Sequence, residues 1–91
     1  MLETLEGTGT LRQPDHPAEQ WRVRYRFEIH TRVVERPGFP PIAAESSGRG
    51  IVTAIDNASI PEGVYWLKAE DGEEIRVQNL GFAGWAILSP G

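Results

Sequence analysis

Cysteine is absent from this chain of 91 residues, so disulfide bonds, thiol catalysis and cysteine-based zinc sites are excluded. No stretch approaches the roughly 18 consecutive apolar residues that a membrane-spanning helix needs. The segment MLETLEGTGT at the start is acidic and has no apolar run, so it lacks the pattern of a signal peptide. We therefore expect a cytoplasmic protein with no membrane among its partners.

The chain also lacks the residue patterns that usually carry catalysis or hold a metal. Its two histidines, His16 and His30, belong to no ligand spacing such as HxH or HExxH. Its serines fall in predicted loops, and none lies within a G-x-S-x-G sequence. We therefore expect no catalytic residues, no cofactor and no metal, with a small enzyme kept as a secondary alternative.

The dominant feature is a two-residue alternation over residues 19–34, EQWRVRYRFEIHTRVV. Apolar and aromatic residues occupy most odd positions, whereas the even positions are polar and mostly arginine. A period of two places the two sets on opposite faces of a β-strand, one buried and one in water. At roughly 3.3 Å per residue a straight strand would be about 50 Å long, so we expect it to bend at a bulge.

Other short segments alternate in the same way. Residues 4–12 place Gly7 and Gly9 on their apolar side, where Tyr25 and Val23 would cover them in an antiparallel pair. Residues 85–88 suit a closing strand, followed by a frayed tail over 89–91. We predict one all-β domain over residues 1–91, a small antiparallel barrel or sandwich of five to six strands with one long bent strand and no significant helix.

Residues 35–50, ERPGFPPIAAESSGRG, are predicted to form a long loop, because three prolines and three glycines disfavour a ladder strand. Long loops without their own secondary structure are usually functional or disordered. Phe39 is an apolar residue within this polar segment. We expect its ring to plug an open end of the barrel, with a partner-binding arm as the alternative.

A short strand is predicted over residues 49–55. Ile51 and Ile55 lie on one side of this segment, and Val52 and Ala54 lie on the other. An apolar run with two apolar sides is typical of a strand that is buried on both faces. We therefore expect both isoleucines to be buried.

Residues 63–80 suit a hairpin whose turn contains Gly72, and two registers compete. A two-residue Asp-Gly loop would set apolar residues opposite charged ones. A three-residue loop, with Gly72 in the left-handed region, sets apolar residues opposite apolar residues and a positive charge opposite a negative one. We therefore expect this register. Its pairs are Leu67 with Ile75, Tyr65 with Val77, Lys68 with Glu74, and Trp66 with Arg76 in a cation–π contact.

The predicted core follows from one apolar face per strand. It contains Trp21, Val23, Tyr25, Phe27, Ile29, Tyr65, Leu67, Ile75, Val77 and Ile87.

Charge is distributed unevenly along the chain. The net charge is −4, yet residues 20–36 contain five arginines and only two glutamates. Carboxylates within the chain are the simplest compensation. The candidates are Glu6 of the first strand, Glu28 of the same strand, and either Glu73 or Glu74 if the hairpin docks alongside. An uncompensated face would instead suit an anionic ligand.

These features favour a non-catalytic β-barrel module that binds a protein partner or associates with itself. The alternative is a binder of an anionic ligand, either single-stranded nucleic acid or a nucleotide, because small barrels combine a basic groove with stacking aromatic rings for this purpose. The candidate ligand-binding or partner-binding residues are Arg22, Arg24, Arg26, Arg32, Trp66, Arg76 and Phe39.

Overall fold

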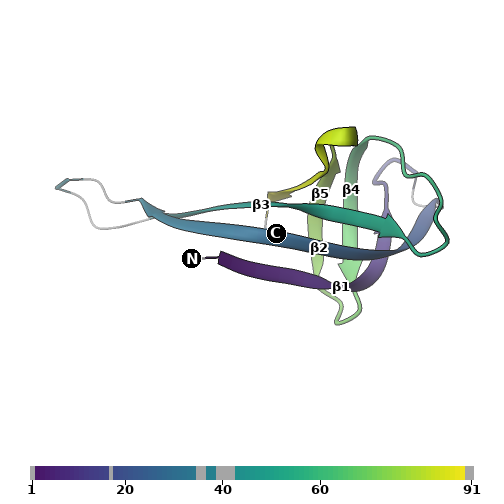
Figure 1. Cartoon of the computed structure of the whole chain (residues 1–91), viewed down its shortest axis with the longest axis horizontal. Coiled ribbons are helices and arrows are strands. Elements are labelled where there is room, and N and C mark those ends of the chain that lie inside the picture. Colours follow the sequence, from purple (N-terminus) through teal and green to yellow (C-terminus); the bar gives the residue numbers. More distant parts are fainter. Residues whose placement is uncertain (1, 17, 35–36, 39–42, 90–91) are drawn as a thin grey trace.

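The computed structural model describes residues 2–16, 18–34, 37–38 and 43–89, and within them the chain forms a closed antiparallel barrel. Its strand order is β1-β2-β3-β6-β5-β4 (Figure 1). The predicted all-β class is confirmed, and the architecture is a barrel. The strands are β1 (Leu2–Arg12), β2 (Gln20–Val34), β3 (Ala43–Ala54), β4 (Gly63–Ala69), β5 (Glu74–Asn79) and β6 (Trp85–Ser89), with a single 3₁₀ turn η1 (Gly81–Ala83) among the described residues.

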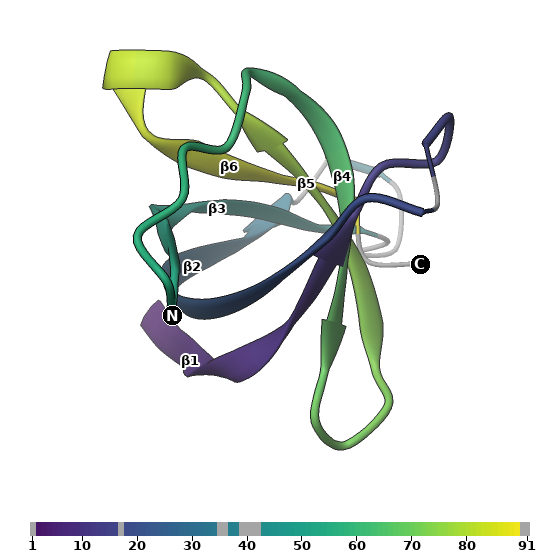
Figure 2. The same ribbon diagram turned by 90° about the vertical axis from the view of Figure 1, so that its right-hand side faces the viewer.

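The long strand β2 extends beyond the barrel together with β3, so the molecule is elongated (Figure 1). Its principal extents are 51 × 26 × 23 Å. β2 curves through the barrel (Figure 2), but its register runs without a break against both β1 and β3. The prediction of a bulge in β2 is therefore wrong. The strand accommodates its length by extending beyond the barrel. The register shift of this barrel lies instead between Arg76 and Val77, where β5 meets β6.

The predicted loop over residues 35–50 is wrong in its second half. β3 begins at Ala43 and pairs with β2 from there to Ala54. Gly48 lies in the predicted loop, and Gly50 lies where that loop overlaps the strand predicted over residues 49–55. Each is a position that a neighbour approaches closely. A Cβ on Gly50 would overlap the carbonyl oxygen of Arg26, and one on Gly48 would lie 2.7 Å from Ile87 Cδ1. The first half of the segment falls largely outside the described residues.

The predicted frayed tail over 89–91 also needs one correction. Ser89 belongs to β6, because β5 offers a backbone partner at Arg76. Residues 90 and 91 lie outside the described part of the chain.

The core occupies the barrel interior, on the face of β2 that the alternation assigned to it. Val23 and Phe27 are fully buried, and Tyr25 is only 7% exposed. The other predicted core residues Tyr65, Leu67 and Val77 are buried as well, while Trp21, Ile75 and Ile87 are partly buried against the cluster and Ile29 is half-buried. Fully burying side chains of this size stabilises the fold by about 1.5–3 kcal/mol each.

Four buried hydrophobic residues of the described chain are not among the ten predicted core residues: Leu11, Val52, Ala54 and Trp85. Burial of Val52 and Ala54 does follow from the prediction for residues 49–55. Trp85 belongs to a cluster of three aromatic rings in the barrel, together with Trp21 and Tyr65. The ring centroids of Trp85 and Tyr65 are 5.7 Å apart, and Trp21 meets Tyr65 edge-on at the same distance. Tilted and edge-on pairs at this spacing are favourable for aromatic rings.

The predicted register of the β4–β5 hairpin is confirmed at every pair. Gly72 has φ = 95°, the left-handed conformation that the three-residue loop requires. The β1–β2 register is confirmed too, with Gly7 opposite Tyr25 and Gly9 opposite Val23. No helix in the described residues is long and apolar enough to span a bilayer.

Candidate functional site

The candidate site is the outer surface of strands β1, β2 and β3, here called the arginine face, around Arg22, Arg24 and Arg26. All three arginines are exposed, as the alternation of β2 predicted. The barrel register surrounds them with fixed neighbours. Arg24 lies between Thr8 of β1 and Thr53 of β3, and Arg26 lies between Glu6 and Ile51.

A shallow depression of about 370 Å³ covers this face. Its size falls within the range of small-ligand pockets, but its open shape suits a surface that an extended segment lies across. It is lined by Glu6, Gly7, Thr8, Arg24, Tyr25, Arg26, Ile51 and Thr53.

Carboxylates partly compensate the arginines. Glu6 lies 3.9 Å from Arg26, so that predicted partner is confirmed, whereas the neighbour of Arg22 is Glu70 at 3.6 Å rather than Glu73 or Glu74. The side chains of Arg22 and Glu70 are 72% and 63% exposed, and an exposed pair of this kind contributes at most about 1 kcal/mol. Glu70 reaches this position because closure of the barrel brings the β4–β5 turn beside β1, where Thr8 Oγ1 donates to Glu70 Oε1 at 2.8 Å.

Arg24 is the exception within the arginine face. Among the described residues, no carboxylate lies within 4.0 Å of its guanidinium. The predicted partner Glu28 likewise makes no ion pair with a described residue. Glu74 is engaged elsewhere, since its Oε1 accepts a hydrogen bond from Arg12 Nη2 at 2.9 Å. The centre of the face thus presents an unpaired cation.

Two apolar side chains flank the arginines in solvent. Ile51 is 62% exposed and Ile55 is 48% exposed, so the prediction that β3 is buried on both faces is wrong. Val52 and Ala54 face the core, and no described part of the chain covers the opposite side of β3. The alternation of β3 identified the two faces, but it did not show which one the barrel encloses.

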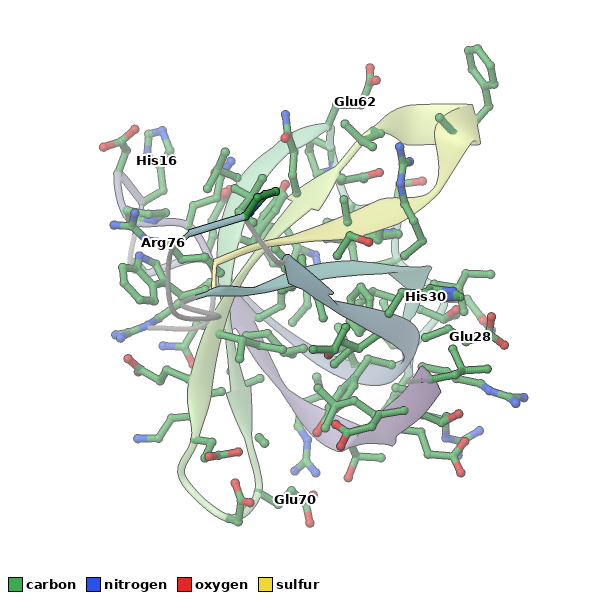
Figure 3. All side chains as sticks on the ribbon, turned by 90° about the vertical axis from the view of Figure 1, so that its left-hand side faces the viewer. His16, Glu28, His30, Glu62, Glu70 and Arg76 are labelled. Carbon is green, nitrogen blue, oxygen red and sulfur yellow. The ribbon has the colours of Figure 1, made fainter. Side chains whose placement is uncertain are left out.

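Trp66 and Arg76 form the predicted cation–π pair, with the guanidinium carbon 4.5 Å from the ring centroid. Trp66 lies opposite Arg12 on β1, and Arg12 is bound by Glu74. Figure 3 shows Arg76 well apart from Glu70, which is beside Arg22. Carboxylates therefore separate this pair from the arginine face, and the two do not form one continuous basic groove.

The remaining candidate residues are placed only in part. The backbone of Arg32 belongs to β2 and pairs with Glu45 of β3. Phe39 lies outside the described residues, so both interpretations of its ring, as a plug or as part of an arm, stay predictions.

A second hollow of about 380 Å³ lies at one mouth of the barrel. Its best-defined polar group is Asn79, whose Nδ2 donates to the carbonyl oxygens of Ile60 and Pro61 and whose Oδ1 accepts from the N–H of Gly81. The side-chain amide of Asn79 is therefore engaged by backbone groups and stabilises the start of the η1 turn. None of the lining residues titrates near neutral pH: they are Val52, Thr53, Ala54, Asn57, Ala58, Ile60, Asn79, Gly81 and Trp85.

Two tyrosines among the described residues have raised pKa values. The pKa of Tyr25 is raised by burial and, secondarily, by the carboxylates of Asp71, Glu70 and Glu73. The pKa of Tyr65 is raised by burial and then by Glu19. Both phenols stay neutral at physiological pH. Within the described residues, no group of three or more carboxylates or histidines is arranged to hold a metal ion.

Comparison with protein-family models, curated proteins and solved structures finds no match. The function is therefore inferred from the chemistry of the surface.

Proposed function

We propose that this chain is a non-catalytic protein-interaction module, and that the arginine face binds an extended, acidic segment of a protein partner. The observation that carries the proposal is the unpaired guanidinium of Arg24 in the same depression as the exposed side chain of Ile51, which lies opposite Arg26. Arginine is enriched at protein interfaces, and the buried core of an interface is more apolar than its rim. A carboxylate of the partner would pair with Arg24 while an apolar side chain covers Ile51.

The alternative of a nucleic-acid binder is less well supported by the charges. Phosphate-binding surfaces depend on several cations that are free to neutralise consecutive phosphates. Here Glu6 and Glu70 lie beside two of the three central arginines, and Glu74 binds Arg12. Of the three central arginines only Arg24 has no described carboxylate within 4.0 Å, and one such cation suits one carboxylate of a peptide better than a run of phosphates.

The proposal of a non-catalytic role is supported by two of the hollows on the surface. The depression on the arginine face is open, and the hollow at the barrel mouth offers no acid or base for proton transfer near neutral pH. The chain contains no cysteine, which agrees with a reducing compartment, so we place its action in the cytoplasm.

Peptide display tests the proposal without a known partner. A library of random peptides is selected against the immobilised chain, and enriched peptides are measured by calorimetry against wild type, Arg24→Gln and Ile51→Thr. Each substitution is expected to weaken binding at least fivefold, the loss of about 1 kcal/mol typical of an interface residue that matters. Val64→Thr is the matched control, since Val64 is an exposed β-branched residue of β4 outside the arginine face.

Enriched peptides without acidic residues, or equal binding by all variants, would contradict the proposal. A parallel titration uses labelled single-stranded DNA and RNA at about 50 and 200 mM salt, with a triple Arg22→Ala, Arg24→Ala, Arg26→Ala variant. We expect no binding at the lower salt. Salt-sensitive binding that the triple variant loses would favour the nucleic-acid alternative.

A further inference from the structure

Half of β1 is an open strand edge. β1 pairs with β2 along its whole length, from Leu2 to Arg12, but with β4 only from Gly9 onward. Residues 2–8, here called the open edge, therefore have a described neighbouring strand on one side only. Figures 1 and 2 both show this part of β1 at the margin of the sheet.

The open edge has only part of the usual protection against pairing with another chain. Natural edge strands are commonly blocked by proline, by charged side chains (lysine above all), by a bulge or by a covering segment. The sequence of the open edge, LETLEGT, contains neither proline nor lysine, and its charged residues are Glu3 and Glu6. Its register against β2 runs without a shift, so no bulge turns it away.

The open edge is also complementary to itself. Consider an antiparallel pair of two copies centred on Leu5. Each residue of the open edge then lies opposite the residue at the same distance from Leu5 on its other side, so all seven residues have a partner in the second copy. The pairs are Leu5 with Leu5, Thr4 with Glu6, Glu3 with Gly7, and Leu2 with Thr8 of the second copy. No like charges face each other, whereas centring the pair on Glu6 would set two carboxylates opposite each other.

The environment of the edge fits this register. Leu5 is half-buried against the core, so a second leucine across the axis extends an existing apolar cluster. Glu6 lies 3.9 Å from Arg26, which offsets part of its charge. These features lower the cost of bringing two acidic strands together.

We infer that the open edge pairs antiparallel with the same segment of a second copy, centred on Leu5. The β3-β2-β1 sheets of the two copies then join into one sheet across a twofold axis. This is an isologous contact, which closes as a dimer and does not propagate. Strand pairing over seven residues buries less than a standard interface, so the dimer forms reversibly with concentration. The inference does not depend on the arginine face, which lies on the surface of the sheet and not on its edge.

Cross-linking tests the register, because the cysteine-free chain allows each introduced thiol to be the only one. Opposite residues in an antiparallel pair have Cα atoms roughly 4.5–5.5 Å apart, within disulfide range. We expect a mixture of Thr4→Cys and Glu6→Cys proteins to form linked dimers at least tenfold faster than either variant alone. In the proposed register two copies of position 4, or of position 6, lie about 8 Å apart, beyond that range.

Thr53→Cys serves as the matched control for random collision, since Thr53 is exposed on β3 away from the open edge. Equal rates for the mixture, the single variants and the control would overturn the inference. Sedimentation of the wild type as a monomer at about 1 mM would overturn it as well.

Introducing a charge of either sign at Thr4 gives a second, independent readout. Thr4→Glu faces Glu6 of the second copy twice in the dimer, so it should raise the dissociation constant roughly 2- to 30-fold, and Thr4→Lys should lower it. Thr53→Glu and Thr53→Lys change the net charge equally at a distant site. If the two positions give the same shifts in sedimentation equilibrium, net charge alone controls association and the proposed pairing is wrong.

Discussion

The hydroxyl oxygen of Tyr25 lies 3.1 Å from the position that a Cβ on Gly7 would occupy. The two residues face each other in the β1–β2 ladder, and the ring fills the space left by the missing side chain. Two glycines on the apolar side of a strand predicted this arrangement, because a large neighbouring ring can cover them. Tyr25 thus connects the interior of the barrel with the strand that also carries the open edge.

Removal of this ring should be costly. Tyr25→Ala is expected to lower the free energy of unfolding by about 3–5 kcal/mol, because it removes a buried aromatic side chain and leaves a cavity above Gly7. Urea denaturation monitored by tryptophan fluorescence measures the change. Tyr25→Phe keeps the ring and should stay within about 1 kcal/mol of wild type. A loss below about 1 kcal/mol for Tyr25→Ala would remove Tyr25 from the core.

Stability should fall in alkaline solution. The pKa values of Tyr25 and Tyr65 are raised above 10.0, first by burial, so the folded protein keeps both protons at a pH where the unfolded chain releases them. Their contribution to stability is complete below about pH 10 and is lost as the pH rises through the folded pKa values. We expect the unfolding free energy to decrease as the pH rises above about 10.

The double variant Tyr25→Phe, Tyr65→Phe checks the origin of that decrease. It should show a shallower dependence on pH over the same range, because neither position can then titrate. These are the only two tyrosines of the chain, so phenolate absorbance in the wild type reports on them alone. An unchanged slope in the double variant would assign the pH dependence to other groups.

Gly50 is expected to tolerate no side chain. A Cβ there would overlap the carbonyl oxygen of Arg26 on the neighbouring strand, and backbone cannot move aside as a side chain can. Gly50→Ala should destabilise by about 1–3 kcal/mol or more through overpacking. Gly48→Ala meets side-chain atoms of Ile87, with Cδ1 at 2.7 Å and Cβ at 3.2 Å, rather than backbone, and should cost less. Thermal unfolding of both variants compares the two, and the reverse order would contradict the close approach of β2 and β3.

The Trp66–Arg76 contact should contribute modestly to stability. A double-mutant cycle with Trp66→Leu and Arg76→Gln is expected to give a coupling free energy of about 0.5–1 kcal/mol, the value for an exposed cation–π pair. Denaturant titrations at low and high salt measure it. A coupling near zero would mean that the 4.5 Å separation has no energetic consequence.

The periodic parts of this fold were predictable from the sequence. The alternation of β2 identified its buried face, since a one-residue slip would have placed arginines in the core. The chemistry of the pairs likewise decided the β4–β5 register, because one loop length matched apolar with apolar residues and the other did not.

The extent of β3 was not predictable in the same way. Gly48 and Gly50 have the composition of a loop, and only the approach of Ile87 and of the Arg26 backbone explains why glycine is needed inside that strand. Ile51 and Val52 are equally apolar, so the sequence alone did not show which of them the barrel encloses.

The candidate site was foreseen only in part. Exposure of Arg22, Arg24 and Arg26 followed from the alternation, as did the pairing of Arg26 with Glu6. Glu70 was missed because its position beside Arg22 depends on barrel closure between β1 and β4, which no local pattern encodes.

The most direct test of the proposed function is mapping of amide shifts in ¹H–¹⁵N spectra during titration with an acidic peptide enriched by display. The proposal predicts that the largest changes fall on Arg24, Ile51 and Thr53, and that Arg24→Gln reduces them at the same peptide concentration. Changes concentrated instead at the barrel mouth, around Asn57 and Asn79, would show that the arginine face is not the binding surface.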